Sequence, residues 1–168
     1  VFSSHVLEHL TDLAAVHAEM GRVLRPEGYC VHVLPSATWR LWTFVTHYPA
    51  YFIGAAAGAL ELLRKVFRRD APGAAAARLA RQVLGQIVPR RHGVRGCALL
   101  EIRLYSRAGW RAMFREYGFE VVQVAPAGLW YTGHMLLGAK LELSDRQRLA
   151  PLLGSSSLIW VVRPGNAT

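Results

Sequence analysis

Residues 1–35, VFSSHVLEHLTDLAAVHAEMGRVLRPEGYCVHVLP, form the stretch that decides the fold. It opens with a short apolar segment that is typical of the end of a buried strand. Apolar residues then recur at helical spacing, after Thr11 or Asp12, which can cap a helix, and before a proline and a glycine that stop it. The β-branched run Tyr29–Leu34 predicts a second buried strand. Strand, helix and strand with short connections predict a right-handed parallel crossover in an α/β protein.

The composition predicts one globular domain over residues 1–168, because 52% of the residues are hydrophobic. Twenty basic against 11 acidic residues give a net charge of +9. More than half of the bases lie between Arg64 and Arg115, which suits an anionic partner, and a basic surface without a ligand explains the block equally well. The block lacks interleaved aromatic residues, so we predict no nucleic-acid partner. Cys30 and Cys97 have no metal-binding spacing and indicate reduced thiols in a cytoplasmic protein.

The segment 38–67 is apolar, with aromatic residues at its start and Arg64 and Lys65 near its end. Its length and flanks would suit a membrane span, but we expect Pro49 to break the helix early, and the Ala/Gly-rich remainder is only weakly apolar. We therefore expect an interfacial or substrate-covering helical pair, with a peripheral membrane contact through residues 38–69. An ordinary buried helix is the alternative.

Later elements are also marked by local signals. Ser106 is predicted to cap a helix that runs to Tyr117, with Gly118 in the position after its C-terminus. Phe119–Ala125 alternates between apolar and polar residues like a strand, and Leu158–Arg163 is expected to be the last strand.

Three stretches resemble class I S-adenosylmethionine-dependent methyltransferases of the type 11 group. Residues 1–35 are similar to the group's fourth strand, "LEH" helix and fifth strand, with RVLRPEG in place of RVLkPGG, so that Glu27 replaces a glycine. SRAGWRAMFREYGFEVVQV, residues 106–124, resembles the penultimate helix and sixth strand, and SLIWVVRP, residues 157–164, the closing antiparallel strand. The resemblance implies a partial Rossmann-like α/β fold, a helical insertion at 38–105 and S-adenosylmethionine as cofactor.

One part of the family pattern does not occur in this sequence. The glycine-rich loop that wraps the cofactor, and the acidic residue that holds its ribose, belong to earlier strands of the family fold. We therefore expect the chain to be the C-terminal part of a longer methyltransferase. The runner-up hypothesis is a non-catalytic remnant, or a domain that docks to a membrane or partner through residues 38–69.

The resemblance also points to site residues, because ligands of open α/β sheets lie beyond the carboxyl ends of the strands. It places Ser3, Ser4 and His5 at such an end, where they would bind the cofactor, with His5 as the catalytic base. The alternative is that the serines only cap a helical turn. The expected substrate-binding residues are Ser36, His92, Tyr131 and His134. Their surroundings suggest a small-molecule or lipid-like methyl acceptor.

The same segment supports a third hypothesis. His5-x-x-Glu8-His9 matches the H-x-x-E-H pattern of inverted zinc peptidases, in which two histidines bind zinc and the glutamate acts as base. However, the motif follows a strand-like start and ends at Thr11-Asp12, too soon for the long helix that such enzymes use. We therefore predict no metal site and place the metallopeptidase third.

Overall fold

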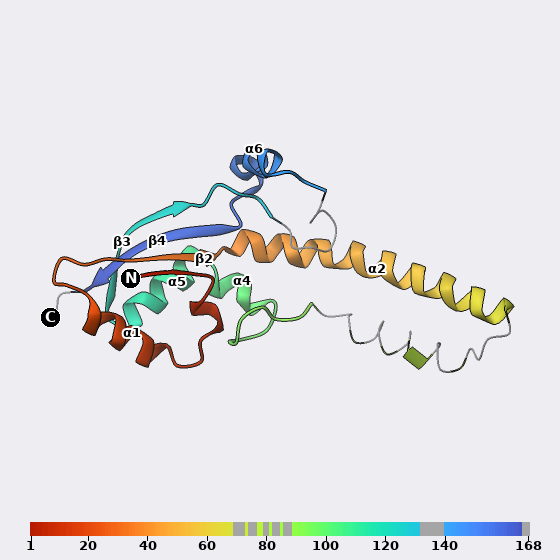
Figure 1. Cartoon of the computed structure of the whole chain (residues 1–168), viewed down its shortest axis with the longest axis horizontal. Helices are drawn as coiled ribbons and strands as arrows, with labels where there is room; N and C mark the ends of the chain where they lie inside the picture. The colour runs from red at the N-terminus through yellow and green to blue at the C-terminus, as the bar shows by residue number, and fades with distance from the viewer. Residues whose placement is uncertain are drawn as a thin grey trace.

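The computed structural model describes residues 1–68, 73, 77, 78, 81, 85, 89–131 and 140–165. Helices and strands alternate, so the predicted α/β class is confirmed. The labelled elements are β1 (Phe2–Ser4), the 3-10 helix η1 (Leu7–His9), α1 (Leu13–Val23), β2 (Cys30–Pro35), α2 (Ala37–Phe67), α4 (Leu100–Leu104), α5 (Arg107–Glu116), β3 (Phe119–Pro126), α6 (Leu143–Leu153) and β4 (Ser157–Pro164) (Figure 1).

The strands form one sheet in the order β1-β2-β4-β3. β1 pairs with β2 in parallel, with Phe2 opposite Val31, as the crossover pattern predicted. β4 runs antiparallel to both of its neighbours, and β3 contains an irregularity between Val121 and Gln123. The parallel pair therefore brings the carboxyl ends of β1 and β2 to the same edge of the sheet.

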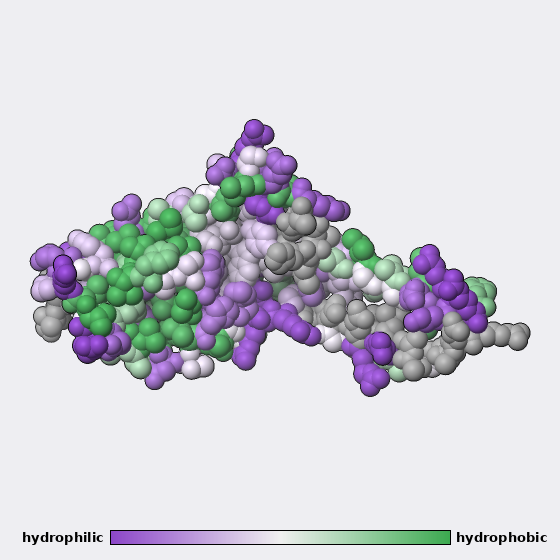
Figure 2. All heavy atoms as spheres, in the orientation of Figure 1, coloured by the Kyte–Doolittle hydropathy of each residue, from purple (hydrophilic) through white to green (hydrophobic). Residues whose placement is uncertain are grey.

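The core lies between the sheet and the helices α1 and α5. Phe114 of α5 contacts His32 of β2 and Trp160 of β4, with ring centroids 5.6 and 5.7 Å apart. Trp110 and Met113 complete the buried face of α5, as its helical spacing predicted. Each such side chain contributes about 1.5–3 kcal/mol when fully buried. On the side of the sheet turned to the viewer, hydrophobic residues gather over the strands (Figure 2).

The predicted caps are confirmed at three helix ends. The Asp12 carboxylate accepts a hydrogen bond from the Ala15 N–H at 2.9 Å at the start of α1. The Ser106 hydroxyl accepts one from the Gly109 N–H at 3.0 Å at the start of α5. Gly118, just after α5, has a φ of +78°, a left-handed conformation that glycine adopts without strain. Each N-cap contributes about 1 kcal/mol.

The long helix α2 corrects one prediction. It runs without a break from Ala37 to Phe67, so the expected interruption at Pro49 and the helical pair are wrong. A proline removes one backbone donor, and the carbonyl that loses its helical partner belongs to Val45, a residue that is 49% exposed. The first turns of α2 contact the rest of the fold, and the later turns extend away from the sheet (Figure 1). Of the helices in the described ranges, none has both the length and the apolar character that crossing a membrane requires.

Candidate functional site

The candidate site lies where β1 ends and the chain turns into η1. The His5 N–H donates to the Val33 carbonyl oxygen at 2.9 Å, which extends the β1–β2 pairing one residue beyond Ser4. His5 then adopts a φ of +52°, in the left-handed region that residues other than glycine rarely occupy. Backbone conformations of this kind cost about 1–3 kcal/mol and occur where the surrounding structure fixes them, often at functional sites.

Both ring nitrogens of His5 have partners. Nδ1 lies 3.2 Å from Glu8 Oε1, and Nε2 lies 3.1 Å from Ser157 Oγ at the start of β4. A carboxylate without a proton only accepts hydrogen bonds, so we assign the proton of the neutral ring to Nδ1, which then donates to Glu8. This tautomer leaves a lone pair on Nε2, which accepts a hydrogen bond from the Ser157 hydroxyl. The His5 side chain is 44% exposed, whereas that of Glu8 is fully buried.

This arrangement has the geometry that general-base catalysis uses: one imidazole nitrogen is held by a carboxylate and the other faces a hydroxyl. The Glu8 carboxylate fixes the orientation of the His5 ring. Ser157 is only 8% exposed, so its hydroxyl is better placed to orient the ring than to attack a ligand. Of the predicted catalytic and cofactor residues, Ser4 and His5 both lie open to solvent at this edge.

Ser3 differs from Ser4. Its hydroxyl lies 2.7 Å from His32 Nδ1, on the helix-covered side of the sheet, and the residue is half-buried. Burial lowers the pKa of His32 to about 4, so the ring is neutral at pH 7. The Ser3 hydroxyl therefore satisfies a core histidine, and its backbone is the part that lies at the edge with Ser4.

Ser36 follows β2 and connects three segments. Its hydroxyl donates to the Ser155 carbonyl oxygen at 2.6 Å and accepts from the Trp39 N–H at 3.0 Å, which caps the first turn of α2. The residue is 3% exposed. Ser36 thus lies at the carboxyl end of β2, as expected, and its hydroxyl holds the start of α2 against the segment before β4. Its contact with a substrate stays a prediction.

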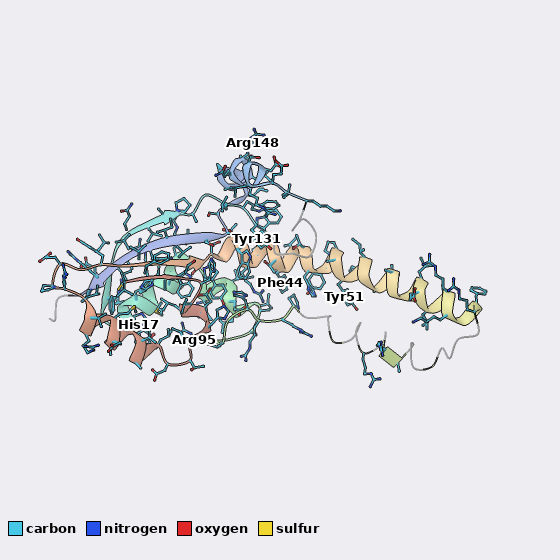
Figure 3. All side chains as sticks on the ribbon, viewed as in Figure 1. His17, Phe44, Tyr51, Arg95, Tyr131 and Arg148 are labelled. Atoms are coloured by element: carbon cyan, nitrogen blue, oxygen red, sulfur yellow. The ribbon has the colours of Figure 1, made fainter. Side chains whose placement is uncertain are left out.

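The other expected substrate residues lie on later loops. The ring of His92 is 4.8 Å from that of His9 and 4.7 Å from that of Trp39, measured between centroids. Burial lowers the pKa of His92, and the neighbouring His9 lowers it further. The Arg146 guanidinium lies 4.9 Å from the centre of the Tyr131 ring, close to the beginning of α2 (Figure 3). His134 lies outside the described residues.

A buried ion pair supports the loop that carries His92. Glu101 Oε1 accepts hydrogen bonds from the backbone N–H groups of His92 and Gly93, both at 2.7 Å. Glu101 Oε2 lies 2.8 Å from Arg40 Nε, whose N–H points to the Ala98 carbonyl oxygen at 3.3 Å. The Arg40 and Glu101 side chains therefore form an ion pair without a hydrogen bond through Nε, because the Nε–H of Arg40 points to the Ala98 carbonyl. Breaking a buried ion pair costs about 3–5 kcal/mol.

Next to this ion pair, Tyr105 and Glu8 line part of a cavity of about 290 Å³ between α4 and α5. The Tyr105 hydroxyl donates to Glu101 Oε1 at 3.4 Å, and burial, followed by the charge of Glu101, raises the pKa of Tyr105. This volume is at the lower end of the range for small-ligand pockets. The cavity lies behind Glu8, on the side where α5 covers the fold.

Two members of this site, Ser157 and Glu101, carry no signal of function in the sequence. Ser157 and Glu101 are ordinary residues in a strand and a helix, and only the tertiary fold brings them to His5 and His92. Glu8 is part of the H-x-x-E-H pattern, which indicates that it matters without indicating its partner. The structure pairs it with His5, three residues earlier.

Comparisons with curated proteins and with solved structures give no match. A family model described as a methyltransferase domain matches residues 1–124, which include β1, η1, α1, β2 and the His92 loop. The match covers well over half of the 168 residues and agrees with the resemblance carried by the LEH and RVLRPEG segments. The chain therefore belongs to the methyltransferase-domain family.

Proposed function

We propose that the protein transfers a methyl group from S-adenosylmethionine to a small or lipid-like acceptor at the carboxyl ends of β1 and β2. The observation that carries the proposal is His5, held between Glu8 and Ser157 at the end of β1 in a chain of the methyltransferase-domain family. The strand order β1-β2-β4-β3, with β4 antiparallel, supports a Rossmann-like methyltransferase sheet over residues 1–168, in which 38–105 form an inserted cap.

The chemistry needs alignment and one proton transfer. When bound, S-adenosylmethionine would supply its methyl carbon to the acceptor atom, and the electron pair of the broken carbon–sulfur bond would stay on sulfur as a neutral thioether. In this proposal the segment of Ser3 and Ser4 borders the cofactor. His5 Nε2 gives up its hydrogen bond with Ser157 and takes the proton of the acceptor. Glu8 stabilises the resulting imidazolium. The segments of Ser36, His92, Tyr131 and His134 border the acceptor.

The lipid-like acceptor is supported by the outer surface of α2. Apolar side chains at helical spacing are exposed along one side of this helix, and basic residues such as Arg64 and Lys65 lie in its last turn. The exposed residues are Leu41 (48%), Val45 (49%), Tyr48 (36%) and Phe52 (64%). A surface of this kind suits peripheral contact of residues 38–69 with an anionic membrane from the cytoplasmic side.

Transfer of a radiolabelled methyl group tests the proposal. The protein is incubated with labelled S-adenosylmethionine and either small phenols, amines and carboxylates or lipid acceptors in anionic vesicles. We expect product with at least one acceptor class, and a kcat lower by about 10²–10⁴-fold in His5→Ala, the usual range for loss of a general base. Val6→Ala, which changes an exposed neighbouring side chain, is the control and keeps its rate. Transfer at the full rate by His5→Ala would rule out His5 as the base.

The second candidate function is docking without catalysis, which the exposed apolar side of α2 favours. Sedimentation with anionic vesicles separates the two candidates. Docking alone would be supported if Phe52→Ser and Val45→Ser weaken vesicle binding and the parent protein neither binds S-adenosylmethionine nor transfers methyl groups. Vesicle binding together with transfer to a lipid acceptor would support the enzyme.

A further inference from the structure

We infer that Glu8, His9 and His92 form a binding site for a divalent transition-metal cation, for which Zn²⁺ is the best-suited ion. One nitrogen of each histidine and one carboxylate oxygen of Glu8 all lie within 4.8 Å of one another. Two imidazoles and one carboxylate are a donor set that binds zinc in proteins. This proposal departs from the expectation of no metal site, and it differs from the H-x-x-E-H interpretation because His92 takes the place of His5, whose Nε2 faces Ser157.

The state of the Glu8 carboxylate supports the site independently. Its side chain is fully buried, and Oε1 is occupied by His5 Nδ1. Oε2 is also buried and has no hydrogen-bond partner within the described part of the chain. An unpaired carboxylate oxygen away from water is costly, and a cation bound to it would remove that cost. Glu8 would then connect the ion through Oε2 with His5 through Oε1.

The backbone around these side chains is already fixed. The Val94 N–H donates to the Glu8 carbonyl oxygen at 3.0 Å, and Glu101 holds the N–H groups of His92 and Gly93. A Cβ atom at position 93 would lie 2.5 Å from the Tyr105 hydroxyl oxygen and 2.7 Å from the Glu8 carbonyl oxygen. The loop and η1 therefore approach each other as closely as only glycine permits. This contact holds His92 against the segment that carries Glu8 and His9.

The buried charges favour a cation, whereas Arg91 and Arg95, which flank His92 on its loop, are not buried. Among the described residues, the buried side chains with a formal charge are Glu8, Glu101 and Arg40. Arg40 lies beside Glu101 at 2.8 Å, so the negative charge of Glu8 is the one without a buried counter-ion. His9 and His92 are exposed, and their ring centroids are 4.8 Å apart. Zinc bonds of about 2.0–2.2 Å require the ligand atoms to move closer by roughly an ångström.

Three protein ligands leave one zinc position open, as in sites that bind water or a substrate oxygen. This site begins three residues after His5, at the edge where β1 ends. If the proposed methyl transfer is correct, an acceptor oxygen in the open position would lie close to the base. This last consequence rests on the proposed function, whereas the metal site itself does not.

The test is a titration of the metal-free protein with Zn²⁺, followed by calorimetry, in the absence of S-adenosylmethionine. We expect one ion per chain. His9→Ala and His92→Ala should each weaken binding by about 100-fold or more, beyond the 10–100-fold effect of losing an outer-shell partner. Both positions are exposed, so these variants keep their fold, which circular dichroism checks. His92→Cys supplies a thiolate ligand and should restore binding.

Two further measurements make the result decisive. Glu8→Gln removes the carboxylate ligand and should weaken Zn²⁺ binding by about 100-fold or more. Glu19→Gln, which removes an exposed carboxylate of α1, is the matched control and should bind Zn²⁺ normally. Co²⁺ should quench Trp39 fluorescence in the parent protein and not in His92→Ala, because the two rings are 4.7 Å apart. No binding by the parent protein, or equal binding by His9→Ala, His92→Ala and the parent, would overturn the site. The titration contains no S-adenosylmethionine, so its result does not depend on whether the protein transfers methyl groups.

Discussion

His17 and His32 lie in the core beside α5, whereas His5, His9 and His92 surround Glu8 at the end of β1. The two core histidines are 2% and 0% exposed and contact the Phe114 ring. The other three are exposed and lie beside a buried carboxylate. The same side chain is therefore a neutral packing element in one region and a candidate base or metal ligand in the other. The surroundings set the role, since His5 and His9 share one five-residue motif and still have different partners.

The largest expected effect on stability comes from the ion pair between Glu101 and Arg40, which supports the loop that carries His92. Glu101→Ala leaves Arg40 buried without its carboxylate and removes the acceptor of the His92 and Gly93 N–H groups. We expect the free energy of unfolding to fall by about 3–5 kcal/mol, measured by urea denaturation. Glu116→Ala changes an exposed residue and should alter it by less than about 0.5 kcal/mol. Equal stability of the two variants would show that the ion pair does not support the site.

Acid should destabilise the folded protein through the core histidine His32. The pKa of His32 is about 4 in the folded protein against an ordinary value of 6.5, chiefly because of burial. Between these values the unfolded chain binds a proton that the folded chain does not, so the contribution to stability is complete above pH 6.5 and is lost as the pH falls to 4. At 1.36 kcal/mol per pKa unit, the shift corresponds to about 3 kcal/mol.

His32→Leu provides the comparison for this acid effect, because carboxylates also titrate in the same range. The parent protein should lose about 3 kcal/mol more than His32→Leu when unfolding is measured at pH 7 and again at pH 4. His17, whose pKa is also lowered by burial, acts in the same direction in both proteins. The same pH dependence in the two proteins would mean that His32 is not buried in its neutral form.

The smallest effect separates two neighbouring serines. Ser3→Ala removes the partner of His32 Nδ1 and should lower the free energy of unfolding by about 1 kcal/mol. Ser4→Ala, at an exposed position, should leave stability unchanged and weaken S-adenosylmethionine binding by about 3–10-fold, the value of one hydrogen bond. Thermal unfolding and cofactor titration of both variants check this. The reverse pattern would place Ser3, and not Ser4, at the ligand.

Features set by neighbouring residues could be predicted from the sequence. Asp12 and Ser106 cap their helices because a short polar side chain precedes an apolar helical pattern, and Gly118 follows α5 because the chain turns there with a positive φ. The strand expected at Tyr29–Leu34 is found one residue later, at Cys30–Pro35. The expected parallel pairing of the first two strands is also present.

Features set by distant residues could not be predicted in this way. Pro49 was expected to end a helix, yet α2 continues, because the loss of one hydrogen bond at the partly exposed residue Val45 is tolerated. Ser157 comes to His5, and His92 to His9, only when β4 and the loop after residue 89 take their places. A local pattern identified Glu8, and the tertiary fold determined which side chains it contacts.

Calorimetric titration of the protein with S-adenosylmethionine tests most directly whether the cofactor binds at the carboxyl ends of β1 and β2. We predict saturable binding of one molecule per chain, weakened in Ser4→Ala and His5→Ala and unchanged in Val6→Ala. Absence of binding by the parent protein, or equal affinity in all of these variants, would contradict the assignment of this edge as the methyl-transfer site.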